Sequence, residues 1–215
     1  MINLYNRDCM LALKEMKDNQ FDLAIVDPPY GINASKRFSE EEHINNNSMM
    51  RLKGHKRKDW DNKIPDKKYF KELIRVSKNQ IVWGGNYFIE NLTNTRCFIV
   101  WDKQNGTNNM ADCELAWASF KTSVRMYRGH IFKGIGCTKY HPIHPTQKPV
   151  KLYEWILMRY ANKGDKILDT HLGSGSIAIA CHNLGFDLEG YELDKEYFES
   201  ANKRLKEHQQ QIRMF

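Results

Sequence analysis

The chain has 215 residues, 41% of them hydrophobic, with a net charge of +7 and a pI near 9.1. This length allows one sizeable core, and no Ser/Gly/Pro-rich linker divides it, so we expect a single domain over residues 1–215. No apolar run approaches membrane-spanning length and the first residues lack a signal-peptide pattern, which excludes a membrane protein and favours a soluble, cytoplasmic one.

Seven apolar stretches have the pattern of β-strands, and helical patterns lie between several of them. The predicted strands cover residues 2–5, 23–26, 80–83, 97–101, 114–120, 166–170 and 187–193, and the predicted helices cover residues 10–16, 67–77, 150–160, 177–184 and 195–207. This alternation predicts an α/β sheet with right-handed crossovers. Residues 97–120 hold two strand patterns and no helix, which indicates an antiparallel pair at one edge.

The stretch FDLAIVDPPYGI, residues 21–32, begins as a strand and ends as a turn. Its apolar, partly β-branched first half suits a central strand of a parallel sheet that is covered on both faces. Pro28 and Pro29 end this strand because they donate no ladder hydrogen bonds and restrict the residue before them. Asp27 and Tyr30 should therefore lie at the carboxyl end of a strand, where open α/β sheets bind ligands. The alternative is a rigid loop with an Asp cap.

Residues 33–59 form a polar stretch without apolar periodicity, interrupted by three consecutive Glu residues. A structureless segment of this length inside a compact domain is usually functional or disordered. We expect a mobile basic insertion that contacts a polyanion, and the alternative is a solvated loop without a partner. Its basic residues are Lys36, Arg37, Arg51, Lys53, Lys56, Arg57 and Lys58.

A second motif lies near the other end of the chain, where a strand pattern ends at Asp169 and a glycine-containing turn leads into a helix. Gly173 and Gly175 let the backbone turn tightly and approach a ligand. Glu192 ends the next strand about twenty residues later, where a carboxylate can accept hydrogen bonds from ribose hydroxyls. Because a full G-x-G-x-x-G is absent, we expect a pocket for a nucleoside with a carboxylate and an amine rather than for NAD.

The five cysteines are odd in number and far apart along the chain. They form no CxxC pair and no Cys/His spacing typical of a metal site. We therefore expect reduced thiols and no bound metal.

Three motifs together resemble those of the β-group S-adenosylmethionine-dependent DNA amino-methyltransferases, in which the catalytic motif precedes the cofactor motif. They are DPPYG at 27–31, HPTQKP at 144–149 and LDTHLGSGS at 168–176. Weaker likenesses at residues 3–16, 81–88 and 98–106 extend the resemblance over nearly the whole chain. It implies a Rossmann-like methyltransferase fold with a mostly parallel seven-stranded sheet, an antiparallel edge hairpin and circularly permuted motif order.

The resemblance also implies the roles of individual residues. The catalytic turn comprises Asp27, Pro28, Pro29 and Tyr30: the Asp27 carboxylate and the Pro28 carbonyl would accept hydrogen bonds from the target amino group. Tyr30 would stack on a base flipped out of the duplex. The implied binding residues for S-adenosylmethionine are Asp8, Asp27, Thr146, Lys148, Asp169, Gly173, Ser174, Gly175 and Glu192.

The chain departs from the family pattern in two places. Thr170 and His171 stand where the family usually has Pro-Phe after the Asp of the cofactor motif. The segment available for target recognition, residues 121–141, is short, and its candidate DNA contacts include Arg125 and Arg128. We therefore expect either a short recognition site or a second subunit.

The resemblance predicts methylation of an exocyclic amino group in DNA, and Asp27 rather than Ser at the first motif position favours adenine N6. The alternatives are cytosine N4, an RNA or protein-glutamine substrate, and a DNA-binding module with a decayed active site. The expected partners are DNA, a second copy of the chain and a companion restriction endonuclease. The expected setting is the cytoplasm of a bacterium or of a phage-infected cell.

Overall fold

A single eight-stranded sheet runs through the protein, in the order β1-β8-β7-β2-β3-β5-β4-β6. The computed structural model describes residues 1–34, 58–104, 111–129 and 143–211. The strands are β1 (Ile2–Asn6), β2 (Phe21–Val26), β3 (Ser77–Trp83), β4 (Cys97–Asp102), β5 (Cys113–Ala118), β6 (Arg125–Arg128), β7 (Lys166–Asp169) and β8 (Asp187–Glu192). The helices are α1 (Cys9–Glu15), α4 (Lys67–Val76), α5 (Val150–Tyr160), α6 (Ser176–Leu184) and α7 (Lys195–Gln210), with short 3-10 turns η1 (Gly85–Tyr87) and η2 (Ile89–Asn91).

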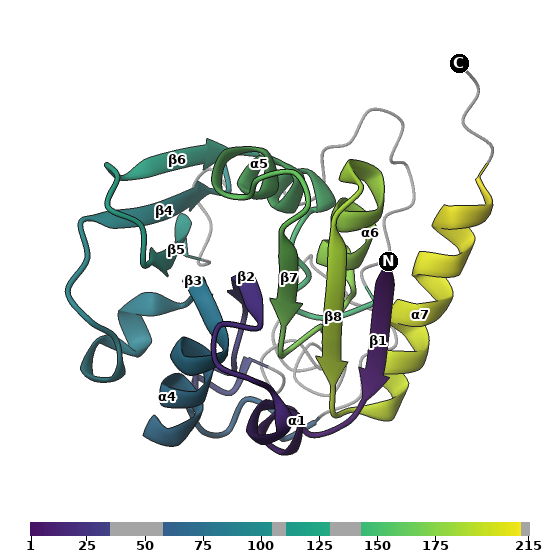
Figure 1. The fold of residues 1–215 in the computed structure, drawn as a ribbon, viewed down its shortest axis with the longest axis horizontal. Helices are drawn as coiled ribbons and strands as arrows, with labels where there is room; N and C mark the ends of the chain where they lie inside the picture. Colours follow the sequence, from purple (N-terminus) through teal and green to yellow (C-terminus); the bar gives the residue numbers. More distant parts are fainter. Residues whose placement is uncertain (35–57, 105–110, 130–142, 212–215) are drawn as a thin grey trace, which may run out of the picture.

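In sheet order, strands β1, β8, β7, β2 and β3 run parallel to one another, and β5 runs antiparallel to its neighbours β3 and β4. Strands β1 and β6 lie at the opposite ends of the sheet (Figure 1). This confirms the predicted α/β fold, its mostly parallel sheet and the antiparallel pair within residues 97–120. The predicted position of that pair at the edge is wrong, because β6 lies beyond β4. All seven predicted strands are present. The eighth, β6, pairs in parallel with β4 inside the segment considered for target recognition.

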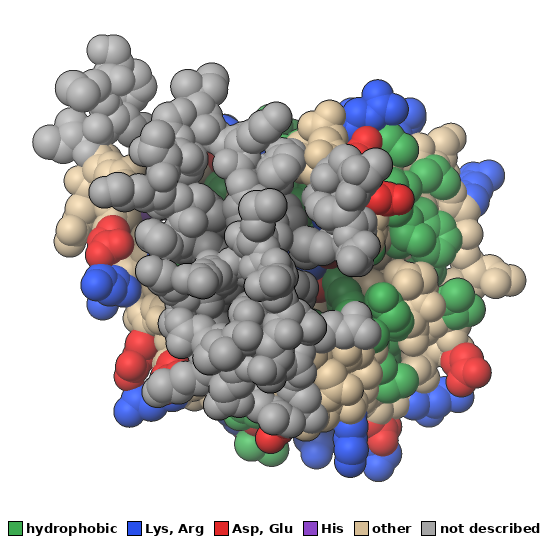
Figure 2. Space-filling view, turned by 180° about the vertical axis from the view of Figure 1, so that it is seen from behind, with side chains coloured by type: hydrophobic (Ala, Val, Ile, Leu, Met, Phe, Trp, Pro, Cys, Tyr) green, Lys and Arg blue, Asp and Glu red, His purple; other side chains and the backbone are tan. Residues whose placement is uncertain are grey.

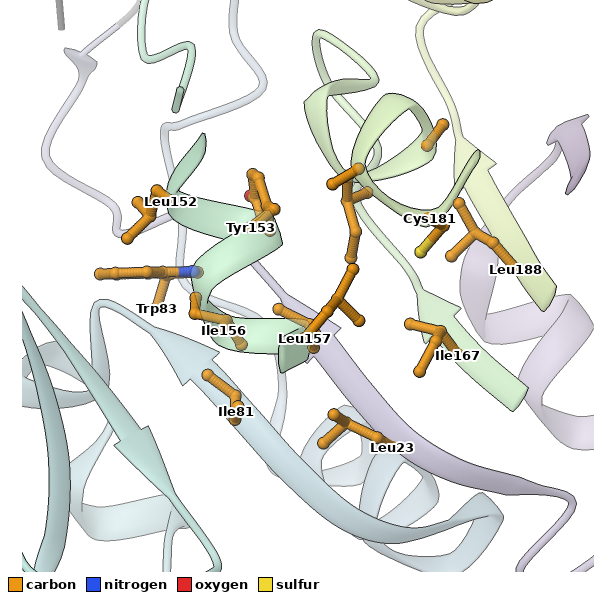
Figure 3. Close-up of a cluster of buried hydrophobic side chains, with 14 of the residues drawn as sticks. Leu23, Ile81, Trp83, Leu152, Tyr153, Ile156, Leu157, Ile167, Cys181 and Leu188 are labelled. Carbon is orange, nitrogen blue, oxygen red and sulfur yellow. The ribbon is translucent and has the colours of Figure 1, made fainter. Parts of the chain in front are cut away.

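Alternation along β2 divides the core into two layers. Leu23 and Ile25 face one cluster, whereas Ala24 and Val26 face the other, because successive side chains of a strand point to opposite faces. The first cluster lies under α5, α6 and α7, and the second lies under α1 and α4. Figure 3 shows side chains of α5, among them Ile156 and Leu157, facing Ile81 of β3 and Leu23 of β2. Both faces of the central strands are therefore covered, as their apolar sequences predicted.

Side-chain caps fix the starts of three helices. Asp8 accepts a hydrogen bond from the backbone N–H of Met10 at 2.7 Å and caps α1, and Asp66 and Asp194 cap α4 and α7 in the same way. Asp8 thus ends the loop after β1, close to the carboxyl ends of the central strands. The predicted contact of Asp8 with a cofactor stays a prediction.

Several predictions concern residues that the structure does not describe. The basic insertion was predicted over 33–59, and residues 35–57 of it lie outside the described part of the chain. The same holds for residues 130–141 of the candidate target-recognition segment. Within the described residues, no helix is long and apolar enough to cross a membrane, and no group of three or more His, Cys, Asp or Glu side chains is arranged to hold a metal ion.

Candidate active site

Three carboxylates lie together at the carboxyl ends of the strands, because β2, β7 and β8 are adjacent and parallel. Asp27 follows β2, Asp169 ends β7 and Glu192 ends β8. Burial, with a smaller contribution from the charges of Asp27 and Glu192, raises the pKa of Asp169 to about 8. Burial also raises the pKa of each of the other two. The arrangement is typical of a site that takes a cationic or hydrogen-bond-donating ligand.

Both oxygens of Asp27 have partners in the protein. The Tyr30 hydroxyl donates to Oδ1 at 2.5 Å, and the Lys148 ammonium donates to Oδ2. Lys148 comes from the HPTQKP motif, is only 2% exposed and lies over the Trp83 ring at 5.1 Å. Burial raises the pKa of Asp27, and the Lys148 ammonium opposes that rise. The motif that was predicted to meet a cofactor carboxylate therefore meets the carboxylate of the catalytic turn in this structure.

Lys148 also belongs to a longer row of alternating charges. Its ammonium lies 3.1 Å from Oε2 of Glu114, whose Oε1 lies 2.7 Å from the Lys103 ammonium. Burial disfavours a charged Glu114, but the two lysines outweigh it and lower the pKa of that carboxyl. Burial likewise disfavours charge on Lys148, yet Asp27 and Glu114 raise its pKa. The row therefore keeps the Lys148 ammonium charged beside Asp27.

The Tyr30 ring is held on several sides. It stacks on Tyr87 with ring centroids 5.0 Å apart and an interplanar angle of 16°, and its edge meets Phe88 at 6.0 Å. Gly84 lies against the ring, since a Cβ at that position would come within 2.2 Å of Tyr30 Cε1. Tyr87 keeps 44% of its surface exposed. An aromatic pair therefore borders the catalytic turn, and one ring of the pair is open to solvent.

The glycine turn is tied to Glu192. Gly173 and Gly175 have φ values of 51° and 69°, a region that favours glycine. The N–H of Gly173 donates to Glu192 Oε2 at 2.8 Å, and the N–H of Asp194 donates to Oε1 at 2.9 Å. The carbonyl of Ser174 accepts a hydrogen bond from Arg204 at 2.8 Å. Glu192 therefore shapes the turn as well as lining it, a role that its spacing alone does not reveal.

The two residues that depart from the family pattern form a connected group. The Thr170 hydroxyl lies 2.7 Å from the hydroxyl of Tyr69 and 2.9 Å from Nδ1 of His171. The backbone N–H of His171 donates to Asp169 at 3.0 Å. Burial lowers the pKa of His171 to about 4, so its ring is neutral near pH 7. Thr170 and His171 therefore supply hydrogen bonds rather than charge beside Asp169.

The HPTQKP segment packs against the turn through His144. Its ring contacts the rings of Tyr197 and Trp60, with centroids 4.4 and 5.0 Å away, and its Nδ1 lies 3.1 Å from the Thr146 hydroxyl. A Cβ added at Gly173 would meet the His144 ring at 3.7 Å. Thr146 is thus directed to His144, and its predicted cofactor contact stays a prediction.

The structure describes three of the nine predicted DNA contacts. Lys58 is paired with Asp194 at 2.6 Å, and Arg128 lies 3.5 Å from Asp102. Arg125 begins the exposed strand β6. In Figure 2 the Lys and Arg side chains of the described residues are spread around the rim of one face, with Asp and Glu between them. The remaining predicted contacts, Lys36, Arg37, Arg51, Lys53, Lys56 and Arg57, lie outside the described residues.

Sequence reasoning missed several residues of the site. Glu114, Lys103 and Tyr87 were not singled out, although a Glu inside the apolar stretch ELAWASF is a signal of a buried charge. Asp61, whose carboxylate accepts three backbone hydrogen bonds from residues 30–34, was also missed. Their partners lie far away in the sequence, so no local pattern pointed to them.

Comparison with known proteins gives this geometry a family. Residues 116–203 match the model of the N6/N4 DNA methylase family, described as DNA methylase. The chain is 25% identical to the type II methyltransferase M.HpaI of Haemophilus parainfluenzae, covering 90% of this chain and 71% of the relative. It is 26% identical to M2.DpnII of Streptococcus pneumoniae, covering 94% and 88%. The chain is therefore similar to N6/N4 DNA methylases, and to type II methyltransferases over most of its length.

The fold agrees with solved members. The crystal structure of the M1.HpyAVI–SAM complex superposes with a TM-score of 0.57 at 24% identity, covering 95% of this chain and 99% of the other. These similarities support an S-adenosylmethionine-dependent DNA methyltransferase. The predicted family and cofactor are thereby confirmed. The same comparisons do not distinguish adenine from cytosine as the target base.

The described residues fit S-adenosylmethionine, which carries a ribose, an amine and a sulfonium. Glu192 uses one lone pair on each oxygen for backbone N–H groups and keeps others for hydroxyl donors. The charges of Asp27 and Glu192 raise the pKa of Asp169, and a cationic ligand among these carboxylates would relieve that repulsion. The donor set and charge of the site thus match this methyl donor.

Glu192→Ala should weaken S-adenosylmethionine binding by about 1–3 kcal/mol, because it removes a hydrogen-bonding charged group and frees the N–H of Gly173. Isothermal titration calorimetry measures the affinity. Glu189→Ala, on the same strand, is the matched control and should bind like the wild type. Equal affinities for the Glu192 variant and the control would contradict the assignment.

Proposed function

We propose that this chain transfers a methyl group from S-adenosylmethionine to the exocyclic N6 amino group of adenine in DNA. The observation that carries the proposal is the partly buried Asp27 carboxylate, held by Tyr30 and Lys148 at the carboxyl ends of the strands, where the glycine turn also lies. An Asp at the first position of the catalytic motif favours adenine in this family. Methylation of cytosine N4 is the second candidate, since the family covers both reactions.

Methyl transfer to an amino nitrogen is an in-line displacement, in which the nitrogen lone pair forms the new C–N bond as the C–S bond breaks. S-adenosylmethionine supplies the methyl group as a sulfonium. The Asp27 carboxylate accepts a hydrogen bond from the amino group, and the Pro28 carbonyl accepts another, which directs the nitrogen lone pair and leaves it available. Lys148 keeps Asp27 in its ionised, accepting form.

Tyr30 and Tyr87 provide the aromatic surface for the flipped base. Their rings already stack at 5.0 Å, and Tyr87 is partly exposed, so the pair lies at the entrance to the catalytic turn. A base can stack at such a surface with a gain of about 1–3 kcal/mol. The Tyr30 hydroxyl donates a hydrogen bond to Asp27. The residue that stacks on the base and the residue that binds its amino group are therefore held together.

Asp27→Ala should abolish methyl transfer and leave cofactor affinity largely intact, because the proposed contact of its carboxylate is with the target amine. DNA from cells that express the wild-type chain, digested to nucleosides and analysed by mass spectrometry, should contain N6-methyladenine. The same assay on the Asp27 variant should find none. N4-methylcytosine instead of N6-methyladenine in the wild-type sample would show that cytosine, and not adenine, is the target. Transfer of labelled methyl groups only to RNA or protein would show that DNA is not the substrate.

Lys148→Met should shift the acid limb of the pH–rate profile to higher pH. The ionised Asp27 carboxylate is the stronger acceptor for the target amine, so the rate falls as the pH drops through its pKa. Burial raises that pKa and the Lys148 ammonium opposes the rise, so removal of the ammonium raises it further. Single-turnover rates measured across pH provide the profile. The control is Lys151→Met, whose side chain is 80% exposed and lies 2.7 Å from Glu154. An unmoved acid limb in the Lys148 variant would contradict this role.

We further propose that basic side chains around the site bind the DNA backbone. Arg125 and Arg128 lie on the exposed strand β6, and the 35–57 segment carries further Lys and Arg residues. Phosphate contacts release counterions, so each lost contact lowers the salt dependence of binding by about 0.9 in logarithmic slope. A second subunit and a companion restriction endonuclease complete the proposal, supported by relatives named type II methyltransferases.

Replacing Arg125 and Arg128 together with Ala should weaken binding to all DNA sequences and flatten its salt dependence. Fluorescence anisotropy at several salt concentrations measures both quantities. S-adenosylmethionine affinity, measured in parallel, should stay unchanged because neither arginine is in the predicted cofactor set. A slope equal to that of the wild type would place the DNA backbone contacts elsewhere.

A further inference from the structure

Asp61 joins the chain after residue 57 to the catalytic turn. Asp61 is only 1% exposed. Oδ1 accepts hydrogen bonds from the N–H groups of Tyr30 at 2.7 Å and Gly31 at 2.9 Å, and Oδ2 accepts one from Ala34 at 2.7 Å. The backbone carbonyl of Asp61 accepts a fourth, from Asn33 at 3.1 Å. One residue therefore gathers the backbone donors of the turn.

These bonds fix the orientation of the peptide groups beside the reacting residues. A peptide group is planar, so holding its N–H also holds the preceding carbonyl. Asp61 thereby fixes the Pro29–Tyr30 and Tyr30–Gly31 peptides. Pro28 and Pro29 have no N–H, which makes the N–H of Tyr30 the first backbone donor after Asp27. Asp61 therefore binds the turn at the first backbone N–H that follows the prolines.

Burial of the Asp61 carboxylate is itself informative. A carboxylate removed from water is costly unless several donors satisfy it. Here three N–H groups do so, all from the turn. The residues that follow Asp61 also pack against this segment. A Cβ at Gly31, whose φ is 71°, would lie 3.2 Å from Ile64 Cγ2. The contact is close and specific to this turn.

Residues 58–61, here called the strap, are also anchored at their other end. The Lys58 ammonium lies 2.6 Å from Asp194 and 3.0 Å from Glu196, beyond β8. The Trp60 ring contacts the His144 ring beside the glycine turn. The strap thus extends from the cofactor side of the site to the catalytic turn.

We propose that Asp61 is a positioning residue for methyl transfer, which acts through the backbone N–H groups of Tyr30, Gly31 and Ala34 to hold the catalytic turn in its reactive form. This inference rests on the proposed methyl transfer. It predicts a loss in the rate of the chemical step rather than in cofactor or DNA affinity. A displacement of about 1 Å in a reacting group can lower a rate by about 100-fold.

The test compares Asp61→Ala and Asp61→Asn with the wild type and with Asp66→Ala as control. Asp66 accepts a backbone hydrogen bond from Lys68 at 2.8 Å as an exposed helix cap, away from the turn. At saturating S-adenosylmethionine and DNA, we expect single-turnover rates to fall about 10- to 100-fold in Asp61→Ala and less in Asp61→Asn, which keeps one acceptor. S-adenosylmethionine affinity should stay within about twofold, and Asp66→Ala should methylate like the wild type.

Hydrogen exchange measured by mass spectrometry on peptides covering residues 28–34 gives a second readout that does not depend on activity. Exchange should become faster in both Asp61 variants and remain unchanged in the control. If Asp61→Ala does not fold, Asp61→Asn decides. Wild-type rates together with wild-type exchange in a folded Asp61 variant would overturn the proposal. A wild-type chain that methylates no DNA would instead overturn the proposed function, and the exchange measurement would still decide whether Asp61 holds the turn.

Discussion

The ion pair of Asp27 and Lys148 is the interaction on which the proposed site depends. Parallel strands bring three carboxylates close together, and burial, with the charges of Asp27 and Glu192, raises the pKa of Asp169. Lys148 reaches Asp27 from a segment more than a hundred residues away in the sequence and supplies a compensating positive charge. Since Lys148 is almost fully buried, its position is set by packing and not by solvent. Its ammonium opposes the rise in the pKa of Asp27 that burial causes, and so favours the ionised carboxylate that the proposed reaction uses.

The antiparallel part of the sheet gives Lys148 its own support. Glu114 on β5 lies between Lys148 and Lys103, so each buried charge in the row has an opposite neighbour. Removing one member would leave an unpaired charge, which costs more than the pair contributes. The parallel strands therefore provide the ligand edge, and the neighbouring antiparallel strands provide the charges that keep it functional.

Most of the fold could be predicted from local pattern, and the partnerships within the site could not. Helix α5 spans Val150–Tyr160 as predicted, because Pro149 precedes a clear helical periodicity. Strand β6 was missed because its residues are polar and mostly exposed at the end of the sheet. The roles of Asp61 and Glu114 depend on contacts made across the fold, which periodicity does not encode. The resemblance identified the motifs, and the packing determined which of their side chains meet.

The pairing of β1 with β8 carries a consequence for how the chain is made. In the register, Ile2 lies opposite Leu188, and β8 and β7 separate β1 from β2. A strand with such a distant partner cannot enter the sheet until most of the chain has left the ribosome. The catalytic turn is synthesised more than a hundred residues before Lys148 and the glycine turn. A product that stops before β7 would therefore contain the catalytic turn and Lys148 but lack the glycine turn and Glu192.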